Sequence, residues 1–280
     1  MASLLFEPGD DPGPNFLELL RRSGSLPPVP QAASGETFSH THGTTVIAIR
    51  YGEGVVMAGD RRATSGNLIS HRAMEKVYPA DRYSGVAIAG AAGMAMDMVK
   101  LFQLQLEHYE KVEGTELSLE GKATQLAAMV RSHLPMAMQG FVVVPLFAGF
   151  DKRRAAGRLF QYDPTGGRYE ESNFASTGSG SLHAATVIKL GWREGLDRGD
   201  TLDLAIKALF NAADEDSATG GPDLVRGIYP TMATITTTGF DRVEEAEIAE
   251  RFRSLVDTLS TTESTTSTGS APSMQGGGLR

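Results

Sequence analysis

The sequence predicts an α+β fold in which two antiparallel sheets are stacked between layers of helices. Strands and helices cluster along the chain, in the order strands, two helices, strands, two helices, strand and helix. This order lacks the strict alternation that is typical of a doubly wound parallel sheet. The chain has 280 residues, of which 41% are hydrophobic, so it can build one substantial core in a single domain.

The first strands are predicted from side-chain type and turn residues. Residues 44–51 are rich in β-branched side chains, and residues 55–58 run back after a turn marked by Gly52 and Gly54. This combination is typical of a β-hairpin. A further strand is predicted over residues 85–89.

Two helices follow in the predicted order. The apolar residues of the first recur at helical spacing and share one face: Val99, Phe102, Leu106 and Tyr109. The second helix is predicted over residues 119–138. We expect it to bend or end near Pro135, because proline interrupts the backbone hydrogen bonding of a helix.

The second half of the domain returns to strands and then to helices. Strands are predicted over residues 141–150, 158–162, 169–175 and 231–238, and helices over residues 181–190, 201–213 and 244–259. The clustering of like elements therefore continues to the end of the domain, as expected for separate helical and sheet layers.

The two ends of the chain differ in composition from this middle region. Residues 1–43 are rich in proline, and residues 260–280 consist mostly of Ser, Thr and Gly. Segments that bury little apolar surface are expected to be loosely ordered. We therefore predict a leader over residues 1–43, a folded domain over residues 44–259 and a flexible tail over residues 260–280.

Charge and composition exclude several classes of function. The formal net charge is -8 and no basic patch is visible, which argues against nucleic acid as a partner. The absence of cysteine excludes disulfides, thiolate zinc sites and cysteine nucleophiles. No segment approaches the roughly 20 apolar residues of a membrane-spanning helix, and the N-terminal segment does not have the pattern of a secretory signal. We expect a cytoplasmic protein that does not contact a membrane.

The junction between Gly43 and Thr44 is the most informative point of the sequence. One interpretation is that Gly43 lies in a turn and that Thr44 is an ordinary strand residue. The other is that the chain is cut after Gly43, which frees an α-amine on Thr44. An α-amine has an ordinary pKa of about 7.7–8.0, so it can act as a general base for the hydroxyl of its own residue. Gly43 would then allow the hydroxyl to approach the carbonyl group.

Three further positions fit this second interpretation. Asp60 lies at the end of the second strand, beside the start of the first in a hairpin, and Lys76 lies in an apolar run. A nearby lysine would lower the pKa of a hydroxyl, and a carboxylate would hold that lysine in place. Gly90, between a strand and a helix, could offer a backbone N–H to an oxyanion. The alternatives are a turn residue for Asp60, a solvated charge for Lys76 and close helix–strand packing for Gly90.

Six short motifs follow one another along the chain: GTTV at residues 43–46, GDRRAT at 59–64, EK at 75–76, AG at 89–90, TGSGS at 177–181 and DSATGG at 216–221. In this order they resemble the motifs of a β-type 20S proteasome subunit, and in detail those of the actinobacterial β subunits. The resemblance covers residues 44–238. It implies the N-terminal-nucleophile hydrolase fold, an αββα four-layer sandwich, which agrees with the element order above.

The resemblance also implies a threonine endopeptidase that removes its own propeptide, residues 1–43, and assigns roles to its site residues. It implies that Thr44 is the nucleophile, that Asp60 and Lys76 are its charge partners and that the Gly90 amide binds the oxyanion. The residues that match the supporting positions around the free amine are Ser179, Asp216 and Thr219. Many relatives carry serine in place of Thr219, but the hydroxyl is retained. Without the resemblance, Ser179 would be interpreted as a helix N-cap and residues 216–219 as a turn.

The resemblance further implies a substrate pocket and a set of partners. The implied pocket residues are all uncharged: Ala63, Met74, Tyr78, Ile88, Ala92 and Met96. A pocket without a carboxylate cannot pair a buried Lys or Arg, so we expect cleavage after bulky apolar residues. The implied assembly is two stacked rings of seven β subunits capped by α-type rings, with an ATPase ring that delivers tagged polypeptides. No metal or cofactor is expected.

Two alternatives to this function remain open at the level of sequence. A non-catalytic ring subunit would keep the fold as a scaffold, but it would be expected to lose Thr44, Asp60 or Lys76, and all three are present. Another N-terminal-nucleophile amidase, which acts on small molecules, is disfavoured by the motifs after Gly59 and by residues 216–221.

Overall fold

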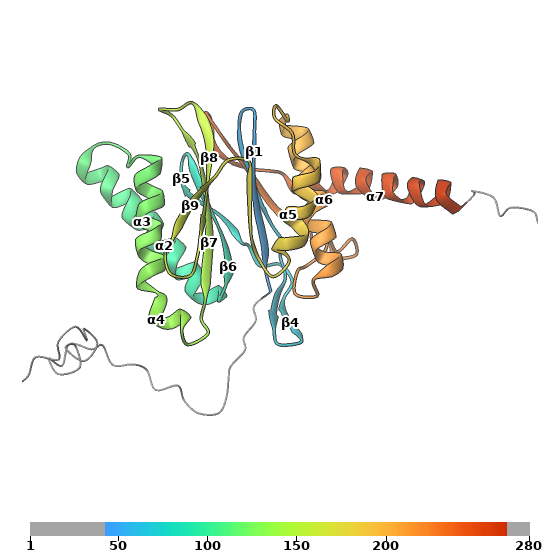
Figure 1. Ribbon diagram of the computed structural model, residues 1–280, viewed down its shortest axis with the longest axis horizontal. Helices are drawn as coiled ribbons and strands as arrows, with labels where there is room; N and C mark the ends of the chain where they lie inside the picture. Colours follow the sequence, from blue (N-terminus) through green and yellow to red (C-terminus); the bar gives the residue numbers. More distant parts are fainter. Residues whose placement is uncertain (1–42, 268–280) are drawn as a thin grey trace, which may run out of the picture. The chain divides into compact units, whose positions relative to one another are not determined.

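The computed structural model describes residues 43–267. Two five-stranded antiparallel sheets are stacked between helices (Figure 1). The first sheet contains, in spatial order, β10 (Phe174–Gly178), β1 (Thr45–Tyr51), β2 (Gly54–Gly59), β11 (Thr231–Thr236) and β12 (Gly239–Arg242). The second contains β5 (Val77–Asp81), β6 (Ser84–Gly90), β7 (Val143–Asp151), β8 (Ala156–Tyr162) and β9 (Arg168–Glu171).

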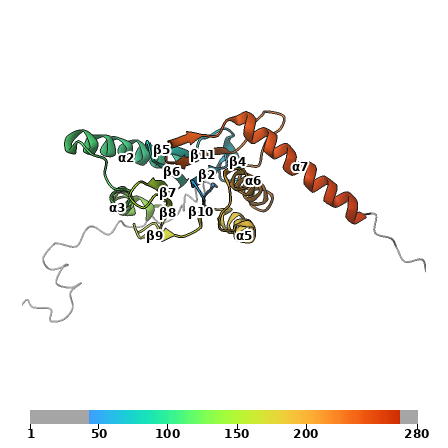
Figure 2. The same cartoon turned by 90° about the horizontal axis from the view of Figure 1, so that it is seen from above.

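Helices cover the outer face of each sheet. The second sheet packs against α2 (Ala92–Glu113) and α3 (Leu119–Ser132), and α3 is followed by the short α4 (Leu134–Ala137). The first sheet packs against α5 (Ser181–Gly191), α6 (Arg198–Glu215) and the first turns of α7 (Glu245–Ser267). In the view of Figure 2, α2 and α3 lie on one side of the strands and α5 and α6 on the other. The predicted α+β class and the αββα order of layers are both confirmed.

Both faces of β1 and β2 are buried, which explains why their sequences are nearly continuous apolar runs. Val46 and Ala48 point into the layer between the two sheets, whereas Ile47 and Ile49 point toward the helices. Side chains alternate between the faces of a strand, and both faces of these central strands meet apolar layers. The predicted hairpin is therefore confirmed as the middle of the first sheet.

Two predicted strands differ in the structure: one is divided into two strands, and the other is shorter than predicted. Residues 169–175 do not form one strand, because β9 pairs with β8 in the second sheet and β10 pairs with β1 in the first. The chain crosses between the sheets at the bend of residues 172–173. Residues 231–238 end as a strand at Thr236, and the chain then turns into β12.

Four strands were not predicted: β12, which follows the turn after Thr236, and three strands in the first half of the domain. β5 contains Pro79, which lowers the strand signal, but β5 is an edge strand, where a missing backbone N–H is tolerated. The hairpin of β3 (Ala63–Ser65) and β4 (Leu68–His71) is short, and all of β4 is exposed, so neither strand shows the alternation of a half-buried sheet.

The predicted helices need smaller corrections. Tyr109 is 37% exposed, unlike the other three residues of its predicted apolar face, because the end of α2 extends beyond the core. The helix before Pro135 ends at Ser132, as expected, and Pro135 lies in the first turn of α4.

The two predicted end segments are only partly described. α7 continues to Ser267, so the first residues of the predicted tail are helical; neither Gly nor Pro occurs between Ser260 and Ser267 to end the helix. Residues 268–280 and the predicted leader, apart from Gly43, lie outside the described residues.

Candidate active site

Thr44 lies immediately before β1, at the point where β1 meets β10. Its carbonyl oxygen accepts a hydrogen bond from the Ser179 backbone N–H at 2.9 Å, and its own N–H donates to Ser179 Oγ at 3.3 Å. The Thr44 hydroxyl donates to the carbonyl oxygen of Gly43 at 2.8 Å. Only 5% of Thr44 is exposed. The hydroxyl is therefore held, away from bulk solvent, against the peptide bond that precedes it.

Asp60 and Lys76 form a buried ion pair beside this residue. Asp60 follows β2 and Lys76 precedes β5, and their Oδ1 and Nζ atoms are 2.6 Å apart. Lys76 Nζ also donates to the carbonyl oxygen of Arg62 at 2.6 Å. Oδ1 of Asp60 accepts the Thr45 backbone N–H at 2.8 Å. The hairpin β1–β2 thus brings the carboxylate to the start of β1, where the sequence predicts it.

Burial and charge act in opposite directions on Lys76. Burial lowers the pKa of the Lys76 ammonium, and the Asp60 carboxylate opposes this, but the pKa stays below its ordinary value. A buried ammonium is costly unless it is paired and hydrogen-bonded. Asp60 and the Arg62 carbonyl provide that pairing, so a positive charge can be kept close to Thr44.

The second oxygen of Asp60 is fixed by backbone groups that the sequence did not reveal. Oδ2 accepts the N–H of Arg62 at 2.9 Å and the N–H of Gly220 at 2.8 Å. Gly220 must approach closely: a Cβ added there would lie 2.6 Å from the Cβ of Arg62. Backbone donors carry no side-chain signal, but the adjacent glycines 220 and 221 mark a place where such an approach is possible.

A second polar group is built on Asp216, at the end of α6. Ser179 Oγ and Thr219 Oγ1 both donate to Asp216 Oδ2, each at 2.5 Å. Burial raises the pKa of Asp216, but the hydrogen bonds from Ser179, Thr219 and the Ala218 N–H outweigh it, so the pKa is lowered. The N-cap interpretation of Ser179 is not supported, because α5 has no side-chain cap. The turn at residues 216–219 is present.

Gly90 ends β6 with a backbone that favours glycine. Its φ is 106°, and an added Cβ would lie 2.0 Å from the carbonyl oxygen of Val142. Close backbone packing therefore explains a glycine at this position. Thr44, Lys76 and Gly90 nevertheless line the same cavity, so the three residues border one space.

The lining of this cavity includes most of the predicted pocket. Four of the six predicted residues contribute to it: Ala63, Met74, Ile88 and Ala92. Tyr78 and Met96 are not among the lining residues; the Tyr78 hydroxyl donates to the Glu75 carbonyl oxygen, and Met96 is 38% exposed. Ala95 also lines the cavity. It lies three residues after Ala92 on α2, a spacing that places both on one face of the helix.

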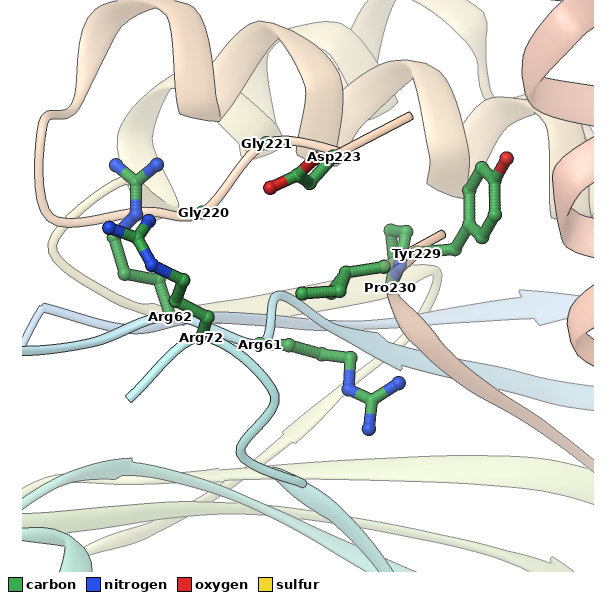
Figure 3. A pocket seen from close by; sticks show the side chains of 9 residues that line it. Arg61, Arg62, Arg72, Gly220, Gly221, Asp223, Tyr229 and Pro230 are labelled. Carbon is green, nitrogen blue, oxygen red and sulfur yellow. The ribbon is translucent and has the colours of Figure 1, made fainter. Parts of the chain in front are cut away.

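A separate pocket lies on the Arg62 and Gly220 side of Asp60. Figure 3 shows the guanidinium groups of Arg62 and Arg72 gathered near Gly220, with the Asp223 carboxylate on the opposite wall. Arg62 Nη1 donates to the Ser217 carbonyl oxygen at 2.9 Å. Thr44 does not line this pocket. Arg62 therefore braces the loop that carries Gly220, and it does not line the cavity that contains Thr44.

Two features are absent from residues 43–267. This part of the chain has no group of three or more His, Asp or Glu side chains arranged to hold a metal ion. It also has no helix that is long and apolar enough to cross a membrane.

Comparison with known proteins identifies the family. The family model described as proteasome subunit matches residues 40–225, which include Gly43, Thr44 and all the groups around them described above. The chain belongs to the proteasome subunit family. The predicted resemblance is therefore confirmed.

Two curated relatives are similar over most of the chain, and both are called proteasome subunit beta. The protein from Acidimicrobium ferrooxidans is 55% identical over 251 residues, which cover 89% of this chain and 92% of the relative. The protein from Streptomyces griseus subsp. griseus is 53% identical over 262 residues, which cover 92% of each chain. As a member of this family the chain is a subunit of a protease that assembles with other proteasome subunits.

Proposed function

We propose that this chain is the catalytic β subunit of a 20S proteasome core and a threonine-type endopeptidase. Thr44 is its nucleophile once the bond after Gly43 has been cut, so residues 1–43 are a propeptide and residues 44–259 the catalytic domain. One observation carries the proposal: Thr44 and the buried Lys76 line one cavity, and Asp60 pairs with the Lys76 ammonium at 2.6 Å.

The first reaction is removal of the leader. The Thr44 hydroxyl donates to the Gly43 carbonyl oxygen at 2.8 Å, so it lies next to the carbonyl carbon that it attacks. Oγ forms an ester bond to Gly43, the peptide C–N bond breaks, and the hydroxyl proton goes to the departing nitrogen. Water then hydrolyses the ester, which releases the leader and leaves Thr44 with a free amine and a free hydroxyl.

The same hydroxyl then cleaves polypeptide substrates. The free amine of Thr44 takes the hydroxyl proton through a water molecule, and the Lys76 ammonium favours the negative oxygen electrostatically. Thr44 attacks the substrate carbonyl, and the Gly90 N–H stabilises the oxyanion. The amine half of the substrate leaves with a proton, and water hydrolyses the acyl-enzyme.

Ser179, Asp216 and Thr219 hold the amine in this scheme. Ser179 Oγ accepts from the Thr44 nitrogen and donates to Asp216. After the cut, the Thr44 nitrogen carries more hydrogen atoms and can keep the same acceptor. This arrangement supports an amine that points in one direction relative to its own hydroxyl.

The assembly is proposed from the resemblance and the relatives. Two stacked rings of seven β subunits would be capped by rings of α-type subunits, in a cytoplasmic particle. An ATPase ring would deliver tagged proteins to it. Apart from Lys76, which is paired with Asp60, the residues that line the cavity are uncharged and none is a carboxylate, which supports a preference for bulky apolar residues before the cut.

The proposal is tested with Thr44→Ala in the full chain. We expect a folded protein that retains residues 1–43 by intact mass and has no peptidase activity on fluorogenic peptides. Thr238→Ala, in the exposed turn between β11 and β12, is the control and should be processed and active. A Thr44→Ala protein that still loses its leader, or wild type whose active form does not begin at Thr44, would overturn the proposal.

A further inference from the structure

We propose that Thr45, the residue after the nucleophile, is a positioning residue for the reaction, an inference that rests on the proposed function. Its backbone N–H contacts the Asp60–Lys76 pair, and its hydroxyl contacts the group built on Asp216. Thr45 thereby links the two sets of polar groups that flank Thr44.

The contacts of Thr45 are short and fully buried. None of Thr45 is exposed. Its N–H donates to Asp60 Oδ1 at 2.8 Å. Its Oγ1 lies 2.6 Å from Thr219 Oγ1 and accepts the Gly180 N–H at 3.0 Å. The partners of Thr45 in these hydrogen bonds are thus two residues of the proposed site, Asp60 and Thr219, and Gly180, which follows Ser179 in the chain.

Counting protons gives these hydrogen bonds a direction. The Thr219 hydroxyl donates its single proton to the Asp216 carboxylate. In the Thr45–Thr219 pair, the Thr45 hydroxyl must therefore be the donor. This leaves the lone pairs of Thr45 Oγ1 for the Gly180 N–H. Gly180 therefore donates to Thr45, Thr45 donates to Thr219, and Thr219 donates to Asp216.

A second branch reaches Asp216 from the nucleophile itself. The Thr44 N–H donates to Ser179 Oγ, and Ser179 donates to the same Asp216 oxygen that Thr219 uses. The two branches meet at Oδ2 of Asp216. Hydrogen bonds joined in this way polarise one another. The Thr45 hydroxyl therefore influences the group that holds the Thr44 nitrogen, as well as being bonded covalently to Thr44.

The surroundings leave little room for an alternative arrangement. A Cβ added at Gly180 would lie 2.5 Å from Thr45 Oγ1 and 2.7 Å from Thr219 Oγ1. A glycine at this position thus leaves the space that the two hydroxyls occupy. A threonine selected only as a strand former could be replaced by valine, which has the same shape and a similar preference for strands. Valine at position 45 would leave the Gly180 N–H and the Thr219 oxygen without their partner.

The experiment compares Thr45→Val with Thr45→Ser in the full chain. We expect Thr45→Val to lower the rate of leader removal and the kcat of peptide hydrolysis by about 10- to 100-fold, as small misplacements of reacting groups do. KM should stay close to wild type, because substrate binding is not altered. The pH profile of kcat/KM should shift, since the group that holds the amine has changed. Thr45→Ser keeps the hydroxyl and should restore both rates and the pH profile.

A matched control separates this role from general packing. Thr234 is a buried threonine of β11, in the same sheet, and lies outside the hydrogen bonds described above. Thr234→Val should leave kcat and the pH profile unchanged. If Thr45→Val does not yield assembled protein, Thr45→Cys is compared with Thr45→Ser: both lack the γ-methyl group, but the thiol is a weaker hydrogen-bonding group than the hydroxyl, so the kcat of Thr45→Cys should fall below that of Thr45→Ser.

Three outcomes would overturn the proposed role of Thr45. A Thr45→Val enzyme with the kcat and pH profile of wild type overturns the inference, as does equal loss in Thr45→Val and Thr45→Ser, or equal kcat in Thr45→Cys and Thr45→Ser. Thr44→Ala is measured in parallel. If it stays active, the proposed function fails; if it is inactive while Thr45→Val is unimpaired, only the role of Thr45 fails.

Discussion

The ammonium of Lys76 lies 2.6 Å from Oδ1 of Asp60, with 1% and 0% of the two side chains exposed. Removing both charges from water costs free energy that offsets much of their mutual attraction. Apolar side chains of similar size often stabilise a protein at least equally. Stability alone therefore does not explain this pair. The proposed function does explain it, because that function requires a positive charge beside the Thr44 hydroxyl.

The first prediction concerns the pH dependence of Asp60→Asn. Burial lowers the pKa of Lys76 and the Asp60 charge raises it, so removing that charge lowers the pKa further. Lys76 then loses its proton at a lower pH. We expect the alkaline limb of the kcat/KM profile to move to lower pH and kcat to fall by at least about 10-fold. Asp241→Asn, on the exposed part of β12, should leave the limb in place; an unmoved limb in Asp60→Asn would show that Lys76 does not act as a cation.

The second prediction uses two adjacent glycines. A Cβ at Gly220 would lie 2.6 Å from the Cβ and 3.0 Å from the N of Arg62, whereas the nearest atom to a Cβ at Gly221 is the Ala213 Cβ at 3.4 Å. Gly220→Ala should therefore displace the N–H that binds Asp60, lowering the free energy of unfolding by about 1–3 kcal/mol and slowing leader removal. Gly221→Ala should resemble wild type. Thermal unfolding and intact mass compare the two, and equal behaviour would contradict the assigned contact.

The sequence predicts the part of the site that local chain geometry controls. Asp60 follows a hairpin whose turn is marked by glycines, so its place beside the start of β1 could be inferred from strand pairing alone. The roles of Ser179 and Asp216 depended on the resemblance, because 37 residues separate them and only the packing of α5 on α6 brings them together.

The remaining contacts could not be predicted, for physical reasons. Oδ2 of Asp60 is held by the backbone N–H of Gly220, 160 residues away, and a backbone group has no side-chain signature. The fold shows the same limit. β5 was missed because Pro79 is acceptable only at a sheet edge, and whether a strand is an edge depends on the whole topology.

The third prediction concerns the pocket. Ala95 is 1% exposed and lines the cavity that contains Thr44, so a larger side chain should narrow it. Ala95→Val should lower kcat/KM for peptides with Leu or Tyr before the cut relative to peptides with Ala, by about 10-fold, the scale of one or two methylene groups in a pocket.

Met96→Leu is the matched control for that prediction. Met96 is the next residue on α2, is 38% exposed and does not line the cavity of this chain. Met96→Leu should therefore leave the preference for Leu or Tyr over Ala before the cut unchanged. A change in Met96→Leu with none in Ala95→Val would favour the pocket implied by the resemblance over the cavity of the single chain.

The fourth prediction concerns stability at the end of the second sheet. Arg158 is 6% exposed, and its guanidinium contacts Glu170 and Glu120, each at 2.6 Å. Arg158→Gln should lower the free energy of unfolding by about 1–2 kcal/mol, since the carboxylates are partly exposed. Hydrogen bonds from Arg158 lower the pKa of both glutamates below 4.5. Their contribution is therefore present above pH 4.5 and is lost as the pH falls through the folded-state pKa values.

The difference between wild type and Arg158→Gln should accordingly shrink below pH 4.5 in denaturant titrations. Arg154→Gln provides the comparison, because Arg154 is 62% exposed and lies 3.9 Å from Glu170. It should have a small effect at every pH. A difference for Arg158→Gln that does not depend on pH would assign its effect to packing of the side-chain stem instead.

The last prediction separates processing from catalysis. A Cβ at Gly43 would lie 1.8 Å from the Cβ of Ala218, so Gly43→Ala must shift the peptide bond that Thr44 attacks. The Thr44 hydroxyl would lose its 2.8 Å contact with the Gly43 carbonyl oxygen, and intact mass should show the leader retained for much longer than in wild type. In the proposed processing, residue 43 leaves with the leader, so chains that do mature are identical to wild type. Activity per mature chain should therefore be unchanged, and a lower value would mean that Gly43 also affects assembly.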